Sequence, residues 1–186
     1  MNRDKTLDVA MRAYWRSDPG DVSVNAICSA AEVSKPSLYR VFGSEDGLMR
    51  AALERYGETV LSEIFVILAR AAPVAQTLDA LIAFASRDPK METGCLFFKM
   101  RAGKHRLGPL TRAKVDEIEA GAIVALAAYL DDRRAGGEAT GDGPSALAAR
   151  YLFEQIGLAL MQRAAGEDSD QIEATLRMAL SVLQPR

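Results

Sequence analysis

Residues 23–42 read Ser-Val-Asn-Ala-Ile-Cys-Ser-Ala-Ala-Glu-Val-Ser-Lys-Pro-Ser-Leu-Tyr-Arg-Val-Phe, and this stretch decides the fold of the N-terminal region. Its first half has apolar residues at the spacing of one helix face, namely Val24, Ile27, Cys28 and Ala31. Ser23 directly precedes them, and a serine hydroxyl there can accept a hydrogen bond from the first turn. We therefore predict a helix of about two turns that begins after Ser23.

The second half of the stretch predicts another short helix, over residues 35–41. Ser34 is placed as its N-cap, and Pro36 lies in its first turn, where a missing N–H group is tolerated. Leu38 and Phe42 fall on the same face of this helix, so we expect that face to point inward.

Longer helices flank these two. A helix over residues 4–16 carries an apolar face, and Ser44 caps a long helix that follows Gly43 and runs to about residue 70. Three helices with a tight turn between the second and the third form a helix-turn-helix unit. Its expected shared core consists of Leu7, Tyr14, Val24, Ile27, Val33, Leu38 and Phe42.

The rest of the chain also predicts helices, and no segment keeps the period-two alternation of a strand. The expected helices cover residues 74–87, 90–101, 110–134, 145–165 and 169–183, with a loop over 135–144. The fold class is therefore all-α, with about nine helices. We expect a helix-turn-helix domain over residues 1–46 and a helical bundle over residues 47–186.

The outward face of the helix at residues 35–41 is suited to double-stranded DNA. It presents Lys35, Ser37, Tyr39 and Arg40, and residues 34–42 contain no acidic side chain. The major groove of DNA is about 12 Å wide and admits one helix, whose N-terminal side chains read the base edges.

These residues resemble the DNA-binding region of the TetR (tetracycline-repressor-like) family over roughly residues 5–56. The resemblance implies an all-helical homodimer whose C-terminal domain binds a small-molecule effector and forms the dimer. It also implies that the recognition helix presents Lys35, Pro36, Ser37 and Arg40 to the groove, and that Tyr39 contacts phosphate. Ser23 and Asn25 are expected to meet the DNA backbone or flanking bases.

Two residues depart from the family pattern. Glu32 occupies the turn between the second and third helices, where the family usually has glycine, so a left-handed backbone there would be strained by about 1 kcal/mol. Glu45 stands where many relatives have a lysine that touches phosphate. We therefore expect a modest dependence of DNA binding on salt and weak non-specific binding.

Composition restricts the other classes of function. The 186 residues include 23 basic and 25 acidic side chains, a net charge of −2, so no overall basic surface attracts DNA. The longest uncharged run, Ala120 to Leu130, has eleven residues, while a membrane-spanning helix needs about 20. With no signal peptide predicted at its N-terminus, we expect a cytoplasmic protein.

Neither an enzyme site nor a metal or cofactor site is visible in the sequence. Cys28 and Cys95 are interpreted as core residues, with a redox role for Cys95 as the alternative, and His105 lacks neighbours at ligand spacing. Residues 99–114 form a basic run without acidic residues up to Lys114. We interpret it as a solvated surface, and the alternative is that it attracts an anionic effector or flanking DNA.

The C-terminal bundle is expected to bind the effector and a second copy of the chain. An apolar cavity could be lined by Phe65, Phe84, Phe97, Phe98, Met100 and Tyr129, although each is also a plausible core residue. The last two helices carry more apolar surface than one bundle face needs, and Gly157 could allow close approach of a partner helix.

We interpret the protein as a ligand-responsive repressor that binds a pseudo-palindromic operator as a homodimer. The alternative is a helical protein-interaction module, or a small-molecule-binding protein, without DNA activity. Such a protein would not need Lys35, Tyr39 and Arg40 on its surface. Effector, operator and regulated genes cannot be predicted from this sequence.

Overall fold

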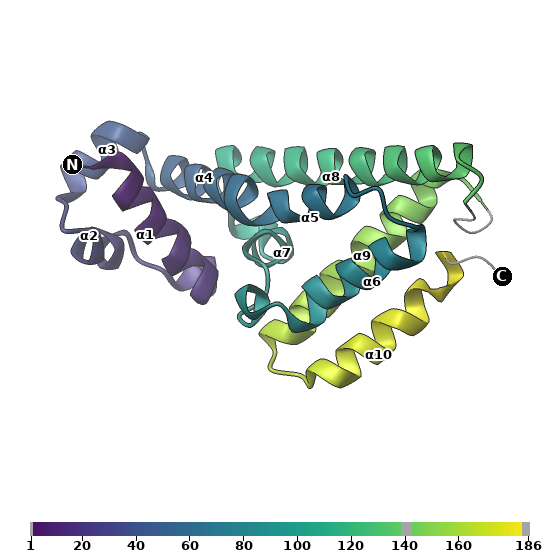
Figure 1. Ribbon diagram of the computed structural model, residues 1–186. Helices are drawn as coiled ribbons and strands as arrows, with labels where there is room; N and C mark the ends of the chain where they lie inside the picture. The colour runs from purple at the N-terminus through teal and green to yellow at the C-terminus, as the bar shows by residue number, and fades with distance from the viewer. Residues whose placement is uncertain (1, 139–142, 184–186) are drawn as a thin grey trace. The chain divides into compact units, whose positions relative to one another are not determined.

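A computed structural model describes residues 2–138 and 143–183, and over these residues the chain is helical and contains no strand (Figure 1). The α-helices are α1 (Arg3–Arg16), α2 (Val24–Ala31), α3 (Lys35–Phe42), α4 (Glu45–Tyr56), α5 (Ser62–Leu68), α6 (Val74–Arg87), α7 (Leu96–Ala102), α8 (Pro109–Ala135), α9 (Ser145–Ala164) and α10 (Ser169–Leu180). A π-helical turn, Gly57–Leu61, joins α4 to α5 without a break. Counting that pair as one, the expected all-α fold with about nine helices is confirmed.

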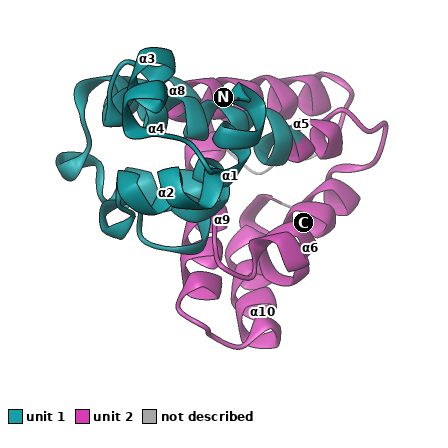
Figure 2. Cartoon of the chain, turned by 90° about the vertical axis from the view of Figure 1, so that its left-hand side faces the viewer, with its two compact units in different colours: residues 1–62, 96–118 teal, residues 63–95, 119–186 magenta. Residues whose placement is uncertain are grey.

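The chain divides into two compact units (Figure 2). The first, here called the N-terminal unit, comprises residues 1–62 and 96–118, and the C-terminal unit comprises residues 63–95 and 119–186. The N-terminal unit therefore contains α4, α7 and the start of α8 in addition to the three helices of the helix-turn-helix. The functional division that we expect after residue 46 stays a prediction.

Side-chain caps begin the helices of the N-terminal unit, as the sequence predicts. The Ser23 hydroxyl accepts a hydrogen bond from the Ala26 N–H at 3.1 Å, and Ser34 accepts one from the Ser37 N–H at 3.4 Å. The Ser44 hydroxyl accepts one from Gly47 at 3.0 Å. Each cap satisfies a backbone donor that the helix itself leaves without a partner.

The core of the N-terminal unit matches the expected set closely. Leu7, Tyr14, Val24, Ile27 and Leu38 are each no more than 4% exposed. Val33 and Phe42 are only half-buried and lie at its edge. Helix α1 packs against α2 and α4, so this core is shared by all the helices around α3.

The turn between α2 and α3 has the left-handed backbone that the sequence suggested. Glu32 has φ 57° and ψ 45°, the one non-glycine residue with positive φ in the described part of the chain. The Val33 N–H donates to the Cys28 carbonyl at 3.0 Å, which closes the end of α2. Glu32 therefore adopts a conformation that glycine adopts without strain.

Two predicted helices differ from the structure. The predicted helix over 90–101 is wrong in its first half, because Pro89–Met91 forms a short 3-10 turn and α7 begins only at Leu96. Gly94 breaks the segment with φ 78°, and a Cβ there would lie 2.6 Å from the Ala164 Cβ. Glycine is needed at this position for both reasons.

The long helix predicted from Ser44 to about residue 70 is interrupted by the π-helical turn. The Thr59 and Ser62 hydroxyls donate to the carbonyls of Arg55 and Glu58, at 2.7 and 2.8 Å. Such bonds to the preceding turn of the helix favour bending, and Gly57 is a poor helix former. The remaining helix bounds agree with the predictions to within a few residues, and the last predicted helix ends as a 3-10 turn, Ser181–Leu183.

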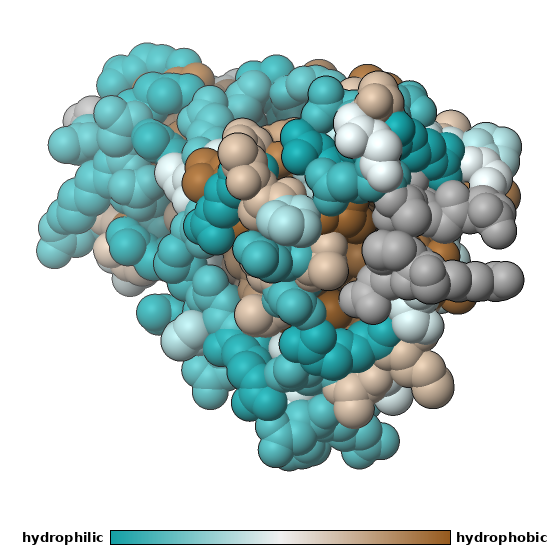
Figure 3. Space-filling model, turned by 45° about the vertical axis from the view of Figure 1, so that its right-hand side comes forward, coloured by the Kyte–Doolittle hydropathy of each residue, from teal (hydrophilic) through white to brown (hydrophobic). Residues whose placement is uncertain are grey.

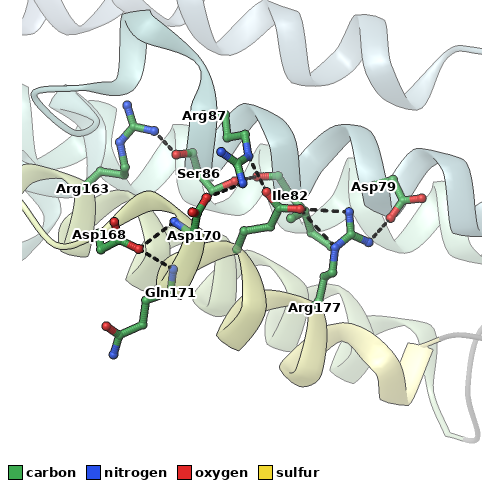
Figure 4. A network of polar contacts seen from close by, with 10 residues as sticks. Asp79, Ile82, Ser86, Arg87, Arg163, Asp168, Asp170, Gln171 and Arg177 are labelled. Carbon is green, nitrogen blue, oxygen red and sulfur yellow. Dashed lines mark hydrogen bonds and ion pairs between the residues drawn. The ribbon is translucent and has the colours of Figure 1, made fainter.

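In the C-terminal unit, α6 packs against α9 and α10, and an ion-pair network links α6 to α10 (Figure 4). Arg87 contacts Glu173 at 2.5 Å and Asp170 at 2.6 Å. Arg177 pairs with Asp79 and with Glu173. Exposed pairs contribute little singly, but connected pairs fix the direction of α10 along α6.

Apolar side chains are also exposed on the C-terminal unit, and hydrophobic atoms show among hydrophilic ones on the face drawn in Figure 3. The most exposed on α8, α9 and α10 are Val124, Leu147, Leu158 and Met178, with Val182 just beyond α10. Gly157 is buried within its own chain. Among the described residues, no helix is long and apolar enough to cross a membrane.

Replacing Glu32 by glycine should stabilise the protein. Glu32→Gly removes the left-handed strain and raises the free energy of unfolding by about 1 kcal/mol. It also removes the exposed Lys5–Glu32 ion pair, whose atoms are 3.3 Å apart and which contributes little. Glu32→Ala is the control, because it loses the same ion pair and keeps the strain. Thermal unfolding measures the stability of the natural protein and of both variants. A Glu32→Gly protein that is no more stable than Glu32→Ala would contradict the prediction.

Candidate nucleic-acid interface

Helix α3 has one fully buried side chain. All of α3 lies in the described part of the chain, and within it only Leu38 is buried, with no exposed area. The helix packs against α2 and α4. Because one face is anchored by Leu38, the opposite face is left toward solvent.

The residues predicted to bind DNA all lie at the surface. Lys35, Pro36 and Arg40 are exposed on α3, and Ser37 and Tyr39 are partly exposed. Ser23 and Asn25 are exposed at the start of α2. The structure therefore places the predicted set on α3 and at the first turn of α2, and buries none of its members.

Contacts within α3 and with its N-cap position three of these side chains. The Lys35 Nζ lies 5.6 Å from the centroid of the Tyr39 ring, a cation–π distance. The Ser34 hydroxyl donates to the Ser37 hydroxyl at 3.0 Å. Arg40 forms no ion pair with any described residue, so its guanidinium keeps its donors for a ligand.

Sequence reasoning missed two surface features beside this face. Val41 is 41% exposed on α3, and it was not included in the predicted interface. Local spacing gives no signal for this exposure, because Val41 lies three residues after Leu38 and directly before Phe42, close to the inward face. Arg3 lies 5.8 Å from the Phe42 ring centroid, and this contact between the first helix and the third was not predictable from local spacing.

The basic run over residues 99–114 is compensated by other parts of the N-terminal unit. Lys104 pairs with Asp116, and Arg106 pairs with Asp18 at 3.3 Å. Lys114 contacts Glu54 at 3.3 Å and Glu117 at 2.7 Å, and the Lys99 ammonium donates to the Trp15 carbonyl at 2.7 Å. These partners favour the structural interpretation of the run over that of an anion site.

Asp46, in the first turn of α4, binds the start of α8 through both carboxylate oxygens. It accepts from the Leu110 N–H at 2.9 Å, the Thr111 N–H at 3.0 Å and the Thr111 hydroxyl at 2.6 Å. The N-terminus of a helix favours a negative charge, so Asp46 caps α8 as well as lying in α4. A Cβ at Gly108 would lie 2.3 Å from the Asp46 carboxyl carbon, so glycine is needed for this approach.

The environment of Asp46 lowers its pKa. Partial burial raises it, but hydrogen bonds from the Thr111 side chain and from the Leu110 and Thr111 backbone outweigh that effect, and the nearby Arg112 adds to them. The carboxylate is therefore ionised at neutral pH. It ties α4, which directly follows α3, to α8 within the same unit.

The aromatic set considered for a ligand cavity is divided between the two units. Phe97, Phe98 and Met100 are buried in the N-terminal unit, whereas Phe84 and Tyr129 are buried in the C-terminal unit. Phe65 is 49% exposed. Both cysteines are buried, His105 is exposed, and the described residues contain no cluster of side chains that could hold a metal.

The helix-turn-helix segment matches a known family. Residues 7–52 match the family model described as bacterial regulatory proteins, tetR family. A Mycobacterium tuberculosis protein described as an HTH-type transcriptional regulator is 35% identical over 75 residues, 40% of this chain and 37% of the relative. The Escherichia coli HTH-type transcriptional repressor ComR is 36% identical over 55 residues, 30% of this chain and 26% of ComR. The chain therefore spans well under half the length of these relatives.

Similarity in structure extends over nearly the whole chain. The reduced form of E. coli NemR has a TM-score of 0.83 at 21% identity and covers 97% of this chain and 96% of its own. A TetR-family regulator from Agrobacterium tumefaciens has a TM-score of 0.85 at 17% identity, covering 98% and 97%. The TetR-family regulator CifR, in complex with 26-bp operator DNA, has a TM-score of 0.77 at 23% identity, covering 98% and 97%. At these identities the likeness shows the fold.

Asp46→Asn should lower the free energy of unfolding by about 1–3 kcal/mol at neutral pH, because it weakens bonds to the start of α8. The pKa of Asp46 is lower in the folded protein, so its contribution is complete above the ordinary aspartate pKa of about 4. That contribution is lost as the pH falls through the lower folded value. The stability difference between the natural protein and Asp46→Asn should therefore narrow below about pH 4.

Urea unfolding across a pH series measures this difference. Glu45→Gln is the matched control, because Glu45 is the exposed neighbour in the same turn and makes no such contact with α8. If the difference in unfolding free energy between the natural protein and Asp46→Asn were as large at the lowest pH as at neutral pH, ionisation of Asp46 would not be the source of the stabilisation.

Proposed function

We propose that the protein is a ligand-responsive transcriptional repressor, on the premise that residues 7–52, which match the family model described as bacterial regulatory proteins, tetR family, form a DNA-binding region. It binds a pseudo-palindromic operator as a homodimer. The single observation that carries the proposal is the outward face of α3, which presents Lys35, Tyr39 and Arg40 on a helix in which only Leu38 is buried.

The proposed contacts divide into those that specify sequence and those that position the helix. Arg40 and Lys35 read base edges in the major groove, where an arginine–guanine pair contributes about 1–3 kcal/mol of discrimination. Tyr39 contacts phosphate, and Pro36 and Ser37 face the groove. Ser23 and Asn25, at the start of α2, meet the backbone or flanking bases and fix the register.

Exposed apolar residues support the homodimer. Leu158 on α9 is 56% exposed and Met178 on α10 is 73% exposed. Burying such side chains against a second copy removes apolar surface from water. A twofold dimer presents two recognition helices about 34 Å apart, or a multiple of that distance, and so requires an operator with two inverted half-sites.

The ligand response follows from coupling between the effector and the operator. If the effector favours a state that binds the operator poorly, the operator must weaken effector binding by the same factor. Because the chain has a net charge of −2 and has Glu45 at the start of α4, its operator affinity should depend only modestly on salt.

The second candidate is a helical interaction module or small-molecule-binding protein that lacks DNA activity. The exposed apolar surface on α9 and α10 would serve such a module as well as a homodimer. Alanine at Lys35, Tyr39 or Arg40 would leave its binding unchanged, whereas it would impair a regulator.

Selection of bound fragments from genomic DNA with the purified protein, repeated at several salt concentrations, tests the proposal. The expected result is a shared inverted repeat whose half-sites are about one helical turn apart or a multiple of it. Retention of fragments without a common motif would contradict operator binding.

Two substitutions on α3 should affect DNA binding differently. Arg40→Ala should weaken binding to the selected operator about tenfold or more and relax the preference at one base pair of each half-site. Tyr39→Phe removes a phosphate contact and should weaken binding to all sequences by a similar factor. Arg150→Ala, an exposed arginine on α9, is the control and should bind like the natural protein. Equal loss of sequence preference in both α3 variants would contradict the assigned roles.

Substitution at the exposed apolar surface should separate the two copies. Leu158→Glu would place an unpaired charge in the interface, so the variant should sediment as a monomer at concentrations where the natural protein is a dimer. Val124→Glu is the matched control on α8, because Val124 is 68% exposed and lies outside the proposed interface. Dimerisation of Leu158→Glu with undiminished affinity would place the interface elsewhere.

A further inference from the structure

A groove runs between α5 and α6 in the C-terminal unit. Its volume is about 610 Å³, within the range of small-molecule sites in proteins. Phe84 and Ile67 are buried beneath it, whereas Val66, at 59% exposed, borders it at the surface. The groove therefore has an apolar floor and an open side.

The spacing of residues on the two helices explains the shape of the groove. On one side lie Glu63, Val66, Ile67 and Arg70, and on the other lie Ala80, Ala83, Phe84 and Arg87. Glu63, Val66 and Ile67 lie on α5, and Arg70 follows two residues after the end of that helix at Leu68. The α6 set follows the spacing of a single helix face over seven residue steps, roughly 10 Å of helix. Ala80 and Ala83 are too small to fill the space above Phe84, so an elongated hollow is left.

Most charged groups along the groove already have partners. Glu63 pairs with Lys90, and Arg87 is held by Glu173 and Asp170 (Figure 4). The Asp88 carboxylate accepts a hydrogen bond from the Lys90 N–H at 2.8 Å.

Arg70 differs from these groups, because none of the described acidic residues forms an ion pair with it. Its guanidinium offers a planar set of donors suited to a carboxylate. The groove therefore combines an apolar floor with one positive charge that no described acidic residue pairs with.

We propose that this groove binds a linear aliphatic carboxylate, with its hydrocarbon chain along Val66, Ala83 and Phe84 and its carboxylate on Arg70. Apolar surface on both helices is then removed from water, and the charge of the ligand is matched by Arg70. The inference deepens the proposed function, since it names the chemical class of the effector and rests on that function for its regulatory meaning.

Calorimetric titration of the full chain with decanoate tests the site without any DNA. The natural protein should bind decanoate and bind 1-decanol at least fivefold more weakly, because the alcohol has the same chain length and no charge. Arg70→Gln should reduce decanoate affinity at least fivefold and leave decanol binding unchanged. Ala83→Trp, which fills the groove from an exposed position, should abolish binding of both.

Arg150→Gln is the matched control and should bind decanoate like the natural protein. Failure of the natural protein to bind decanoate, or equal binding by the natural protein and Arg70→Gln, would overturn the proposal. Binding that survives in Ala83→Trp would place the ligand outside the groove and overturn it as well.

A second measurement separates this inference from the proposed function. Operator affinity is measured with and without saturating decanoate. If decanoate binds with the expected dependence on Arg70 and operator affinity does not change, the binding site is supported and the proposed ligand response is contradicted. If operator binding is intact and decanoate does not bind, the groove proposal alone fails.

Discussion

The burial of Leu38 is the contact on which the candidate interface depends. Helix α3 has 8 residues, too few to be stable alone, so its helical state and its direction come from packing. With Leu38 fixed against α2 and α4, every other side chain of α3 is left at least partly accessible. A short helix with one buried residue can present most of its surface outward, and this is the geometry that reading a major groove requires.

Most of this region is predictable from the sequence because its determinants are local. A serine before each of α2, α3 and α4 makes a bond within its own first turn, and the apolar spacing defines the inward face of each helix. The strain at Glu32 was also foreseeable from the resemblance, because the family usually has glycine in this turn and the chain has a glutamate. The exposed position of the predicted site residues follows directly from these local rules.

Features that depend on distant residues were not predictable in the same way. Nothing near Asp46 in the sequence indicates that its carboxylate binds the start of α8, more than sixty residues away. The requirement for Gly94 depends on Ala164, and the arginine pairs that join α6 to α10 depend on residues from two distant helices. The π-helical turn after α4 keeps the apolar stripe of a regular helix, so periodicity alone predicts an unbroken one.

If the protein binds an operator as proposed, charge compensation decides how it can approach the DNA. The basic run over residues 99–114 is largely matched by acidic residues of the same unit, and the first 56 residues contain as many acidic as basic side chains. Long-range attraction to the phosphate backbone is therefore weak, and it cannot supply most of the binding free energy. In the proposed complex, the affinity for DNA then comes from short-range contacts of α3, and it is sensitive to the direction of that helix. The contacts that hold α3 in place therefore influence sequence discrimination. They are the burial of Leu38, the helix caps and the bond from Asp46 to α8.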